Sequence, residues 1–122
     1  MMFFPLKNKI AERKILRMEY KAAKATGVVR MGQTIFFFRQ GLKVYYITYE
    51  EIVKCFRRVM VISAGAEKGS MELETLVIAD NERELAQIQL PGAGAAKQLL
   101  EELKIKMPHA DFSSPNKAEK IV

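Results

Sequence analysis

The sequence predicts a mainly β (α+β) domain, in which a bent antiparallel barrel of six to seven strands is capped by one C-terminal amphipathic helix. Three observations support this prediction. Short runs rich in apolar, aromatic and β-branched residues recur along the chain, turn residues separate them, and a clear helical period follows the last run. Strands do not alternate with helices, so a parallel nucleotide-binding sheet is disfavoured.

Residues 15–22 are the first candidate strand. From Leu16 onward apolar and polar residues alternate, which is the period of a half-buried strand. The same residues are mostly Ala, Lys, Glu, Arg and Leu, which are good helix formers. We predict a strand here, preceded by a basic N-terminal segment over residues 1–14.

The centre of the chain predicts two hairpins and one long strand between them. A Gly-containing turn joins the first pair of runs, and an Asp-Asn-Glu turn joins the second pair. The predicted strands cover residues 35–38, 44–49, 52–62, 74–79 and 84–90, with a flexible loop at 64–70. In the last strand the alternation places Ala86, Ile88 and Leu90 on the inward face.

Residues 95–106 predict the C-terminal helix. Its apolar stripe recurs at helical spacing and consists of Ala96, Leu99, Leu100, Leu103 and Met107. Pro108 ends this helix. The polar residues 113–122 lack any period and predict a flexible tail, so residues 1–112 form a single domain.

One run carries a family resemblance. Residues 40–52 read Gln-Gly-Leu-Lys-Val-Tyr-Tyr-Ile-Thr-Tyr-Glu-Glu-Ile, a strand that leads into an aromatic and acidic corner. With Arg57-Arg58-Val59 and the final helix, this resembles bacterial pleckstrin-homology-like (PH-like) domains over about residues 15–107. The resemblance implies a bent, incomplete barrel plugged by the C-terminal helix.

The resemblance also suggests where an anion would bind. Phosphoinositide sites of eukaryotic PH domains use basic residues in and around the first hairpin, and Lys21, Lys24 and Arg30 lie in comparable sequence. Val28 stands where the second basic residue of that pattern would be. The phosphoinositide motif is therefore incomplete in this chain.

Size and composition limit the remaining possibilities. The 122 residues match one domain, and the single cysteine, Cys55, excludes an intrachain disulfide and suits a reducing compartment. No run approaches the ~20 apolar residues of a membrane span. The opening Met-Met-Phe-Phe-Pro-Leu is too short for a signal-peptide core. We therefore expect a cytoplasmic protein.

The net charge of +6 is concentrated in the first half of the chain. Residues 1–30 hold eight Lys and Arg against two Glu, whereas residues 61–100 hold three bases against six acids. A basic half attracts phosphate groups or acidic proteins, although a charge of this size also serves only solubility.

The sequence shows no convincing catalytic constellation. His109 is the only histidine, so a histidine-based metal cluster is excluded, and Cys55 lies inside an apolar strand. Lys97 follows a small-residue run but lacks the Gly-Lys-Ser/Thr of a phosphate loop. We predict a chain that is not an enzyme and that uses no metal and no cofactor.

Aromatic residues point most clearly toward binding. Phe36 and Phe38 point to one face of their strand, while Ile35 and Phe37 point to the other. Antiparallel sheets usually expose one face to solvent. Apolar residues on both faces therefore predict that the outer face is covered by the N-terminal segment, a second subunit or a partner.

We predict a non-catalytic interaction module that presents a sheet face and its basic surface to a protein partner or to its own copy. Its expected contact residues are Phe36, Phe38, Arg39, Lys43 and Arg58. The alternative is binding of a phospholipid headgroup or nucleic acid through Lys7, Lys9, Arg13, Lys14, Lys21, Lys24 and Arg30. Nucleic acid is the weaker of these two ligands because no RNA-recognition signature is present.

Overall fold

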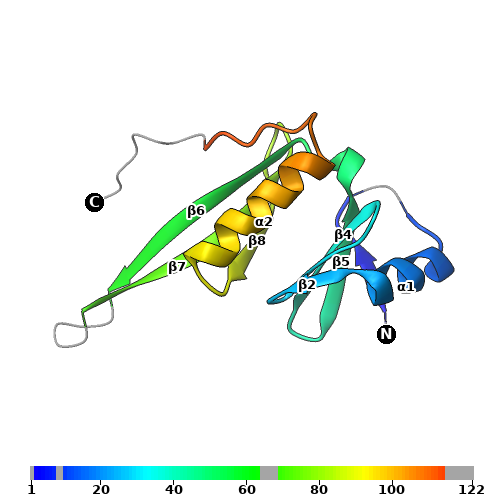
Figure 1. Cartoon of the computed structure of the whole chain (residues 1–122), viewed down its shortest axis with the longest axis horizontal. Coiled ribbons are helices and arrows are strands. Elements are labelled where there is room, and N and C mark those ends of the chain that lie inside the picture. The colour runs from blue at the N-terminus through cyan, green and yellow to red at the C-terminus, as the bar shows by residue number, and fades with distance from the viewer. Residues whose placement is uncertain (1, 8–9, 64–68, 115–122) are drawn as a thin grey trace.

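The computed structural model describes residues 2–7, 10–63 and 69–114. Within these residues the chain forms eight strands, two α-helices and one 3₁₀ turn, arranged in two separately hydrogen-bonded sheets (Figure 1). The first sheet has the order β1-β5-β4-β3-β2 and the second has the order β6-β7-β8.

The elements follow one another as two antiparallel meanders. They are β1 (Phe3–Pro5), α1 (Arg13–Ala22), β2 (Lys24–Thr26), β3 (Val29–Met31), β4 (Ile35–Gln40), β5 (Lys43–Thr48), the 3₁₀ turn η1 (Tyr49–Glu51), β6 (Lys54–Ser63), β7 (Ser70–Ala79), β8 (Glu84–Leu90) and α2 (Ala93–Lys106). Strand β1 pairs in parallel with β5, and the other pairs are antiparallel. Gly27 and Gly41 make the tight turns of the first sheet with φ of +60° and +63°, a conformation that other residues rarely adopt.

The main core joins both sheets and α2. Phe36 and Phe38 of β4 contribute to it, together with the inward residues of β7 and β8. The stripe of α2 that contacts this core is buried at Ala96, Leu99 and Leu103, Met107 directly after the helix is buried with it, and Leu100 packs at its margin. The helical stripe and the inward phase of Ala86, Ile88 and Leu90 are therefore confirmed.

The strand predicted for residues 15–22 is wrong, because this segment is helix α1. Leu16 and Tyr20 lie four residues apart, which places both on the helix face that contacts the sheet. Over a run this short, alternating apolar and polar residues are compatible with one apolar helix face as well as with a half-buried strand. The good helix formers of the segment, and the absence of Gly and Pro within it, favour the helix.

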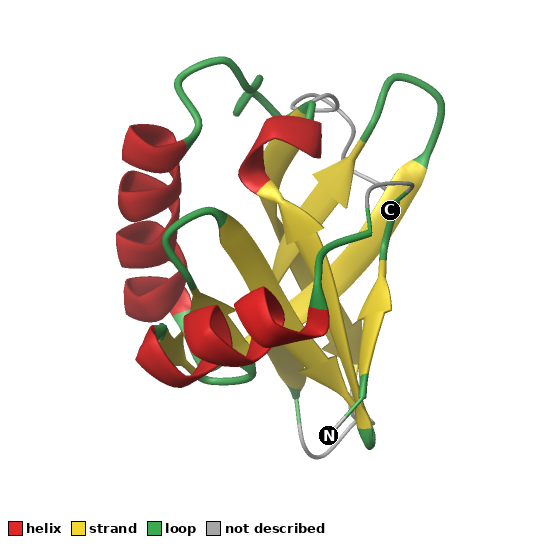
Figure 2. Cartoon of the chain, turned by 90° about the vertical axis from the view of Figure 1, so that its right-hand side faces the viewer, coloured by secondary structure: helices red, strands yellow, loops and turns green. Residues whose placement is uncertain are grey.

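Helix α1 covers the outer face of the first sheet (Figure 2). A second apolar cluster forms there from Leu16, Ile35, Phe37, Val44 and Tyr46, and Phe3, Ala11 and Tyr20 pack against it. The backbone N–H of Ala11 donates to the Tyr46 hydroxyl at 3.2 Å, and that of Leu6 donates to the Tyr46 carbonyl at 2.8 Å. The sequence predicted that this face is covered by the N-terminal segment, a second subunit or a partner. Residues near the N-terminus of the chain itself cover it.

The mainly β fold with a C-terminal helix is confirmed, as are the two hairpins and the long strand between them. Among the described residues no strand of one sheet pairs with a strand of the other, so closure into a barrel stays a prediction. The loop residues 64–68 and the tail residues 115–122 lie outside the described residues. No helix in the described part of the chain is long and apolar enough to cross a membrane.

Candidate interaction surface

Two of the predicted contact residues are buried. Phe36 and Phe38 lie in the main core with at most 1% of their surface exposed, so the prediction that they touch a partner is wrong. The alternation that places them on one face was correct, but that face is the interior. Arg39 and Lys43 are exposed beside the β4–β5 turn, and Arg58 forms an ion pair with Glu84.

The three predicted anion ligands do not form one site. Lys24 contacts both carboxylate oxygens of Glu102 on α2 at 3.2 Å. The Arg30 guanidinium lies 4.2 Å from the centre of the Tyr20 ring and donates to the Tyr20 carbonyl at 3.1 Å, so Arg30 fastens α1 to the first sheet. Lys21 is exposed on α1 and belongs to a different group of cations.

That group is the basic strip of α1, which consists of Arg13, Lys14, Arg17 and Lys21. Arg13, Arg17 and Lys21 are spaced four residues apart and therefore share one side of the helix. All four are exposed and line one shallow hollow with Met18. Within the described residues, none of the four has a carboxylate within ion-pair distance.

A carboxylate of α1 that would neutralise this strip points elsewhere. Glu19 accepts hydrogen bonds from the backbone N–H groups of Thr34 and Ile35 at 2.9 and 3.1 Å, and from the Thr34 hydroxyl. Gly32 permits this contact, since a Cβ there would lie 2.5 Å from Glu19 Oε1 and 2.8 Å from the Ile35 carbonyl oxygen. Glu19 therefore anchors α1 to the start of β4.

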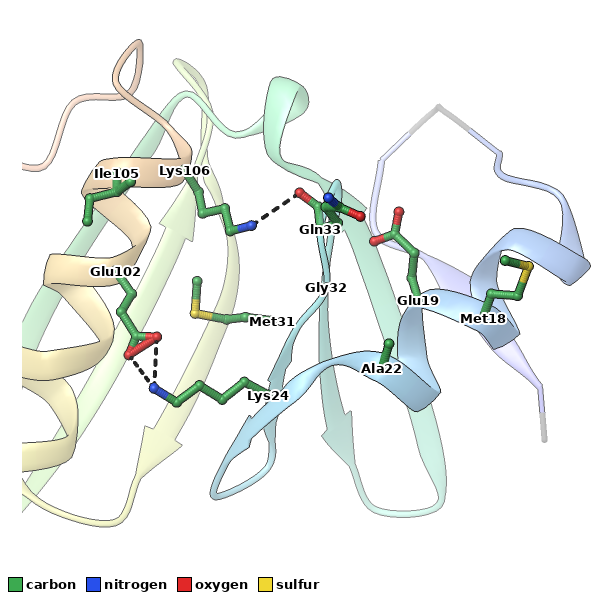
Figure 3. Close-up of a pocket in the computed structure, with 10 residues that line it drawn as sticks. All are labelled: Met18, Glu19, Ala22, Lys24, Met31, Gly32, Gln33, Glu102, Ile105 and Lys106. Atoms are coloured by element: carbon green, nitrogen blue, oxygen red, sulfur yellow. Dashed lines mark hydrogen bonds and ion pairs between the residues drawn. The ribbon is translucent and has the colours of Figure 1, made fainter.

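An open groove of about 590 Å³ adjoins the basic strip (Figure 3). It lies between α1, the β3–β4 connection and the end of α2, and we call it the α1–α2 groove. Its lining residues are Met18, Glu19, Ala22, Lys24, Met31, Gly32, Gln33, Glu102, Ile105 and Lys106. Met18 and Ile105 leave 62% and 80% of their surface exposed at its edges.

The charged groups of this groove already contact one another or the backbone. Lys24 pairs with Glu102, and Lys106 Nζ donates to the Gln33 carbonyl at 3.4 Å (Figure 3). Beside the groove, the Tyr49 hydroxyl donates to the Gly32 carbonyl at 2.7 Å, and burial raises the pKa of this hydroxyl. The groove therefore has apolar walls and a rim whose charges compensate one another, and Met18 connects it to the four cations of the strip, which have no carboxylate within ion-pair distance in the part of the chain that the structure describes.

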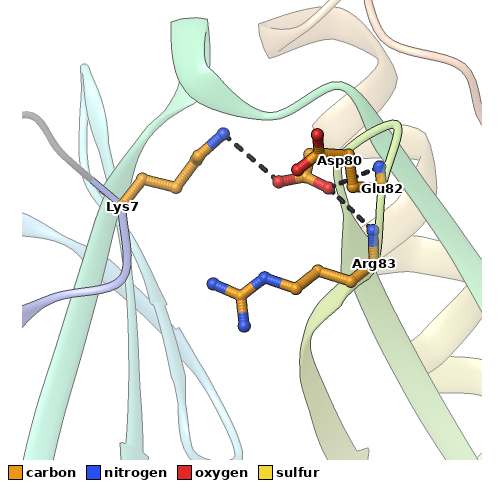
Figure 4. Close-up of polar contacts among 4 residues, drawn as sticks. All are labelled: Lys7, Asp80, Glu82 and Arg83. Carbon is orange, nitrogen blue, oxygen red and sulfur yellow. Dashed lines mark hydrogen bonds and ion pairs between the residues drawn. The ribbon is translucent and has the colours of Figure 1, made fainter.

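A second polar cluster ties the N-terminal segment to the second sheet (Figure 4). Asp80 accepts hydrogen bonds from the backbone N–H groups of Glu82 and Arg83 at 2.8 and 2.9 Å, and Lys7 Nζ lies 3.3 Å from the carboxylate. The bonds to the Arg83 and Glu82 backbone, and then Lys7, lower the pKa of Asp80. Lys7 is therefore a structural cation, while Lys9 lies outside the described residues.

The single cysteine, Cys55, lies in the interior. Cys55 is fully buried, and burial raises the pKa of its thiol to about 12, so it is protonated at neutral pH. His109 Nε2 lies 3.1 Å from the Ile52 carbonyl. In the described ranges, no three His, Cys, Asp or Glu residues gather where they would hold a metal ion.

No family model, curated protein or solved structure matches this chain. Function is therefore inferred from the chain's own residues. Sequence reasoning missed Arg17 and the groove. The spacing of Arg13, Arg17 and Lys21 was a readable signal, but it indicates a common face only if residues 13–22 are helical.

Proposed function

We propose that this chain is a non-catalytic interaction module that binds an acidic segment of a protein partner through the basic strip of α1 and the α1–α2 groove. The observation that carries the proposal is the position of Met18, which lines both the groove and the hollow between the cations. Apolar side chains of the partner enter the groove, while its carboxylates lie against Arg13, Lys14, Arg17 and Lys21.

The proposal includes a PH-like architecture. A four-strand meander from β2 to β5, a three-strand meander from β6 to β8 and one C-terminal helix support it. In this proposal the two sheets are the walls of a bent, incomplete barrel, and α2 covers the opening between them. Strand β1 and helix α1 are an N-terminal addition, and they bring the basic strip to the groove.

A protein segment fits this surface because the surface combines two kinds of contact. Long-range attraction between the cations of the strip and carboxylates speeds encounter and orients the partner. Methionine-lined apolar grooves accept side chains of varied shape, since the thioether is flexible and polarizable. The inert Cys55 and the carboxylates held by arginines at Glu74 and Glu84 support a non-catalytic role.

Peptide binding tests this function. The probe is a labelled amphipathic peptide with Leu on one side and Glu on the other, and its twin carries Gln in place of Glu. We expect fluorescence anisotropy to report binding of the acidic peptide only, and the affinity to fall as salt screens the charges. Equal binding of the Gln twin would contradict the role of the strip.

Three variants assign the binding to residues. Arg13→Glu with Arg17→Glu should weaken the acidic peptide about tenfold or more, and Ile105→Asp should weaken it through the groove. The matched control is Arg39→Glu with Lys43→Glu, which makes the same charge change at the exposed residues that the sequence favoured. Loss of binding in the control instead would move the site to the β4–β5 turn.

A second candidate function is binding to an anionic membrane surface, because Ile10 and Ile15 are exposed near the basic strip. Exposed apolar residues beside cations are typical of helices that lie in the membrane interface. Vesicles that contain phosphatidylserine distinguish the two functions. Membrane binding should be lost with Arg13→Glu and Arg17→Glu and retained with Ile105→Asp, since a flat surface does not enter the groove.

A further inference from the structure

The far half of the β6–β7 hairpin extends beyond the rest of the second sheet (Figure 1). The last residue of β8, Leu90, pairs with Glu74, so Met71 to Leu73 pair with β6 alone. We call residues 59–62 of β6 and 71–73 of β7 the distal ribbon. A two-stranded ribbon without a third strand is only marginally stable in water.

Apolar side chains occupy both faces of this ribbon. Met60 lies opposite Leu73 and Ile62 lies opposite Met71, so these four residues share one face. Val59 and Val61 point to the other face, opposite Glu74 and Glu72. Val61 and Met71 leave 65% and 55% of their surface exposed, and Val59, Met60 and Ile62 leave about 40–45%.

The outer edge of β6 is also open along most of its length. Asp111 bonds to Val53 and Cys55 through the backbone and thereby covers the start of the strand. From Phe56 to Ser63, no strand in the described ranges pairs with this edge. Residues 59–62 contain no charge, proline or glycine, which are the devices that usually protect an exposed edge.

We propose that two copies of the chain associate through this edge, with β6 of one copy antiparallel to β6 of the other around a two-fold axis at Val61. Such a pair extends the sheet to six strands, β8-β7-β6 in one copy and β6-β7-β8 in the other. An axis perpendicular to the sheet keeps each face on its own side. The apolar faces formed by Met60, Ile62, Met71 and Leu73 then become continuous across both copies.

Charge supports a second copy as the occupant of this edge. The cations nearest the ribbon, Arg57 and Arg58, are neutralised within each copy. Arg57 donates to both oxygens of Glu74 at 2.5 and 2.9 Å, and Arg58 donates to Glu84. An antiparallel pair centred on Val61 sets residues 59–63 of one copy against residues 63–59 of the other, and none of these residues is charged.

The size of the patch sets the expected strength. Side chains with these exposed fractions make an apolar patch of a few hundred Å², which is less than the ~800 Å² that each partner contributes to a standard interface. We therefore expect a reversible dimer with a dissociation constant in the micromolar range or above. The net charge of +6 repels two copies, so added salt should strengthen the dimer.

Sedimentation of the full chain over a range of protein concentrations tests the proposal at about 0.05 and 0.5 M salt. We expect a monomer–dimer equilibrium that salt shifts toward the dimer. Val61→Lys should raise the dissociation constant about tenfold or more, because it places two lysines on the axis. Leu42→Lys is the matched control, since it makes the same change at a fully exposed residue of the β4–β5 turn and should leave the constant unchanged.

Amide hydrogen exchange shows whether the edge itself is used. The β6 amides that point away from β7 should exchange more slowly as the protein concentration rises. A monomer at every concentration would overturn the proposal, as would a dimer unaffected by Val61→Lys or one in which these amides stay unprotected. A dimer that salt dissolves would assign association to the basic strip and would also overturn it.

Discussion

The β4–β5 hairpin and the far half of the β6–β7 hairpin both have apolar side chains on two faces, but they differ in what surrounds them. In the first hairpin one face meets the main core, and the other is covered by α1, with the side chains of Phe3 and Ala11 packed beside it. In the second, both faces of residues 59–62 remain largely exposed.

This difference teaches that an apolar pattern alone does not identify a binding surface. The outer face of β4 and β5 is buried because the preceding residues return across it. Tyr46 receives a hydrogen bond there, and Tyr20 packs edge-on against Phe37 with ring centres 5.2 Å apart. No described segment returns across the distal ribbon. The same kind of pattern therefore forms a core in one place and a candidate interface in the other.

Truncation of one large side chain in each hairpin should give the largest contrast. Phe37→Ala removes a fully buried ring and should lower the free energy of unfolding by about 3–5 kcal/mol. Met60→Ala removes a half-exposed side chain and should cost about 0.5 kcal/mol or less. Urea unfolding at low protein concentration measures both. Similar losses would show that the ribbon is packed as firmly as the covered hairpin.

Much of the β structure was predictable because its signals are local. The strands around Gly41 are rich in aromatic and β-branched residues, and a two-residue turn with Gly joins them. The inward phase of β8 followed from strict alternation. Strands β2 and β3 have three residues each, which is too short for a period to be recognised.

The surface was less predictable because its determinants are remote in sequence. Lys24 counts as a free cation until α2 brings Glu102, 78 residues later, to its side. Alternation separated Phe36 and Phe38 from Ile35 and Phe37 but did not say which pair faces the main core. Both pairs are buried, since a helix predicted as a strand covers the second one.

Weakening the contact between α1 and the first sheet should make the outer face of the β4–β5 hairpin more exposed, as the faces of the distal ribbon are. Leu16 is the buried residue of α1, and Leu16→Ala should lower the free energy of unfolding by about 2–4 kcal/mol. Partial release of α1 should also increase binding of an apolar dye to the native protein. Met18→Ala on the same helix is the control and should change stability by about 0.5 kcal/mol or less. Equal effects of the two changes would mean that α1 is not held by its apolar face.

The smallest expected effect is a pH dependence at the point where the ribbon leaves the three-stranded sheet. The ion-paired hydrogen bonds from Arg57 lower the pKa of Glu74 from its ordinary value near 4.5. Because the folded state holds this proton less tightly than the unfolded state does, the pair stabilises the fold above about pH 4.5. That contribution is lost as the pH falls through the lowered pKa of the folded state.

We therefore expect the free energy of unfolding to decrease below about pH 4.5 and Glu74→Gln to flatten this decrease by about 1 kcal/mol. Urea unfolding across the acid range measures the slope. The control is Glu82→Gln, which makes the same charge change at an exposed residue of the β7–β8 turn, away from Arg57, and should leave the slope nearly unchanged. If both variants flatten the slope equally, the Arg57–Glu74 ion pair makes no specific contribution to stability at the point where the ribbon leaves the three-stranded sheet. The boundary is then set by apolar burial alone, at the end of β8.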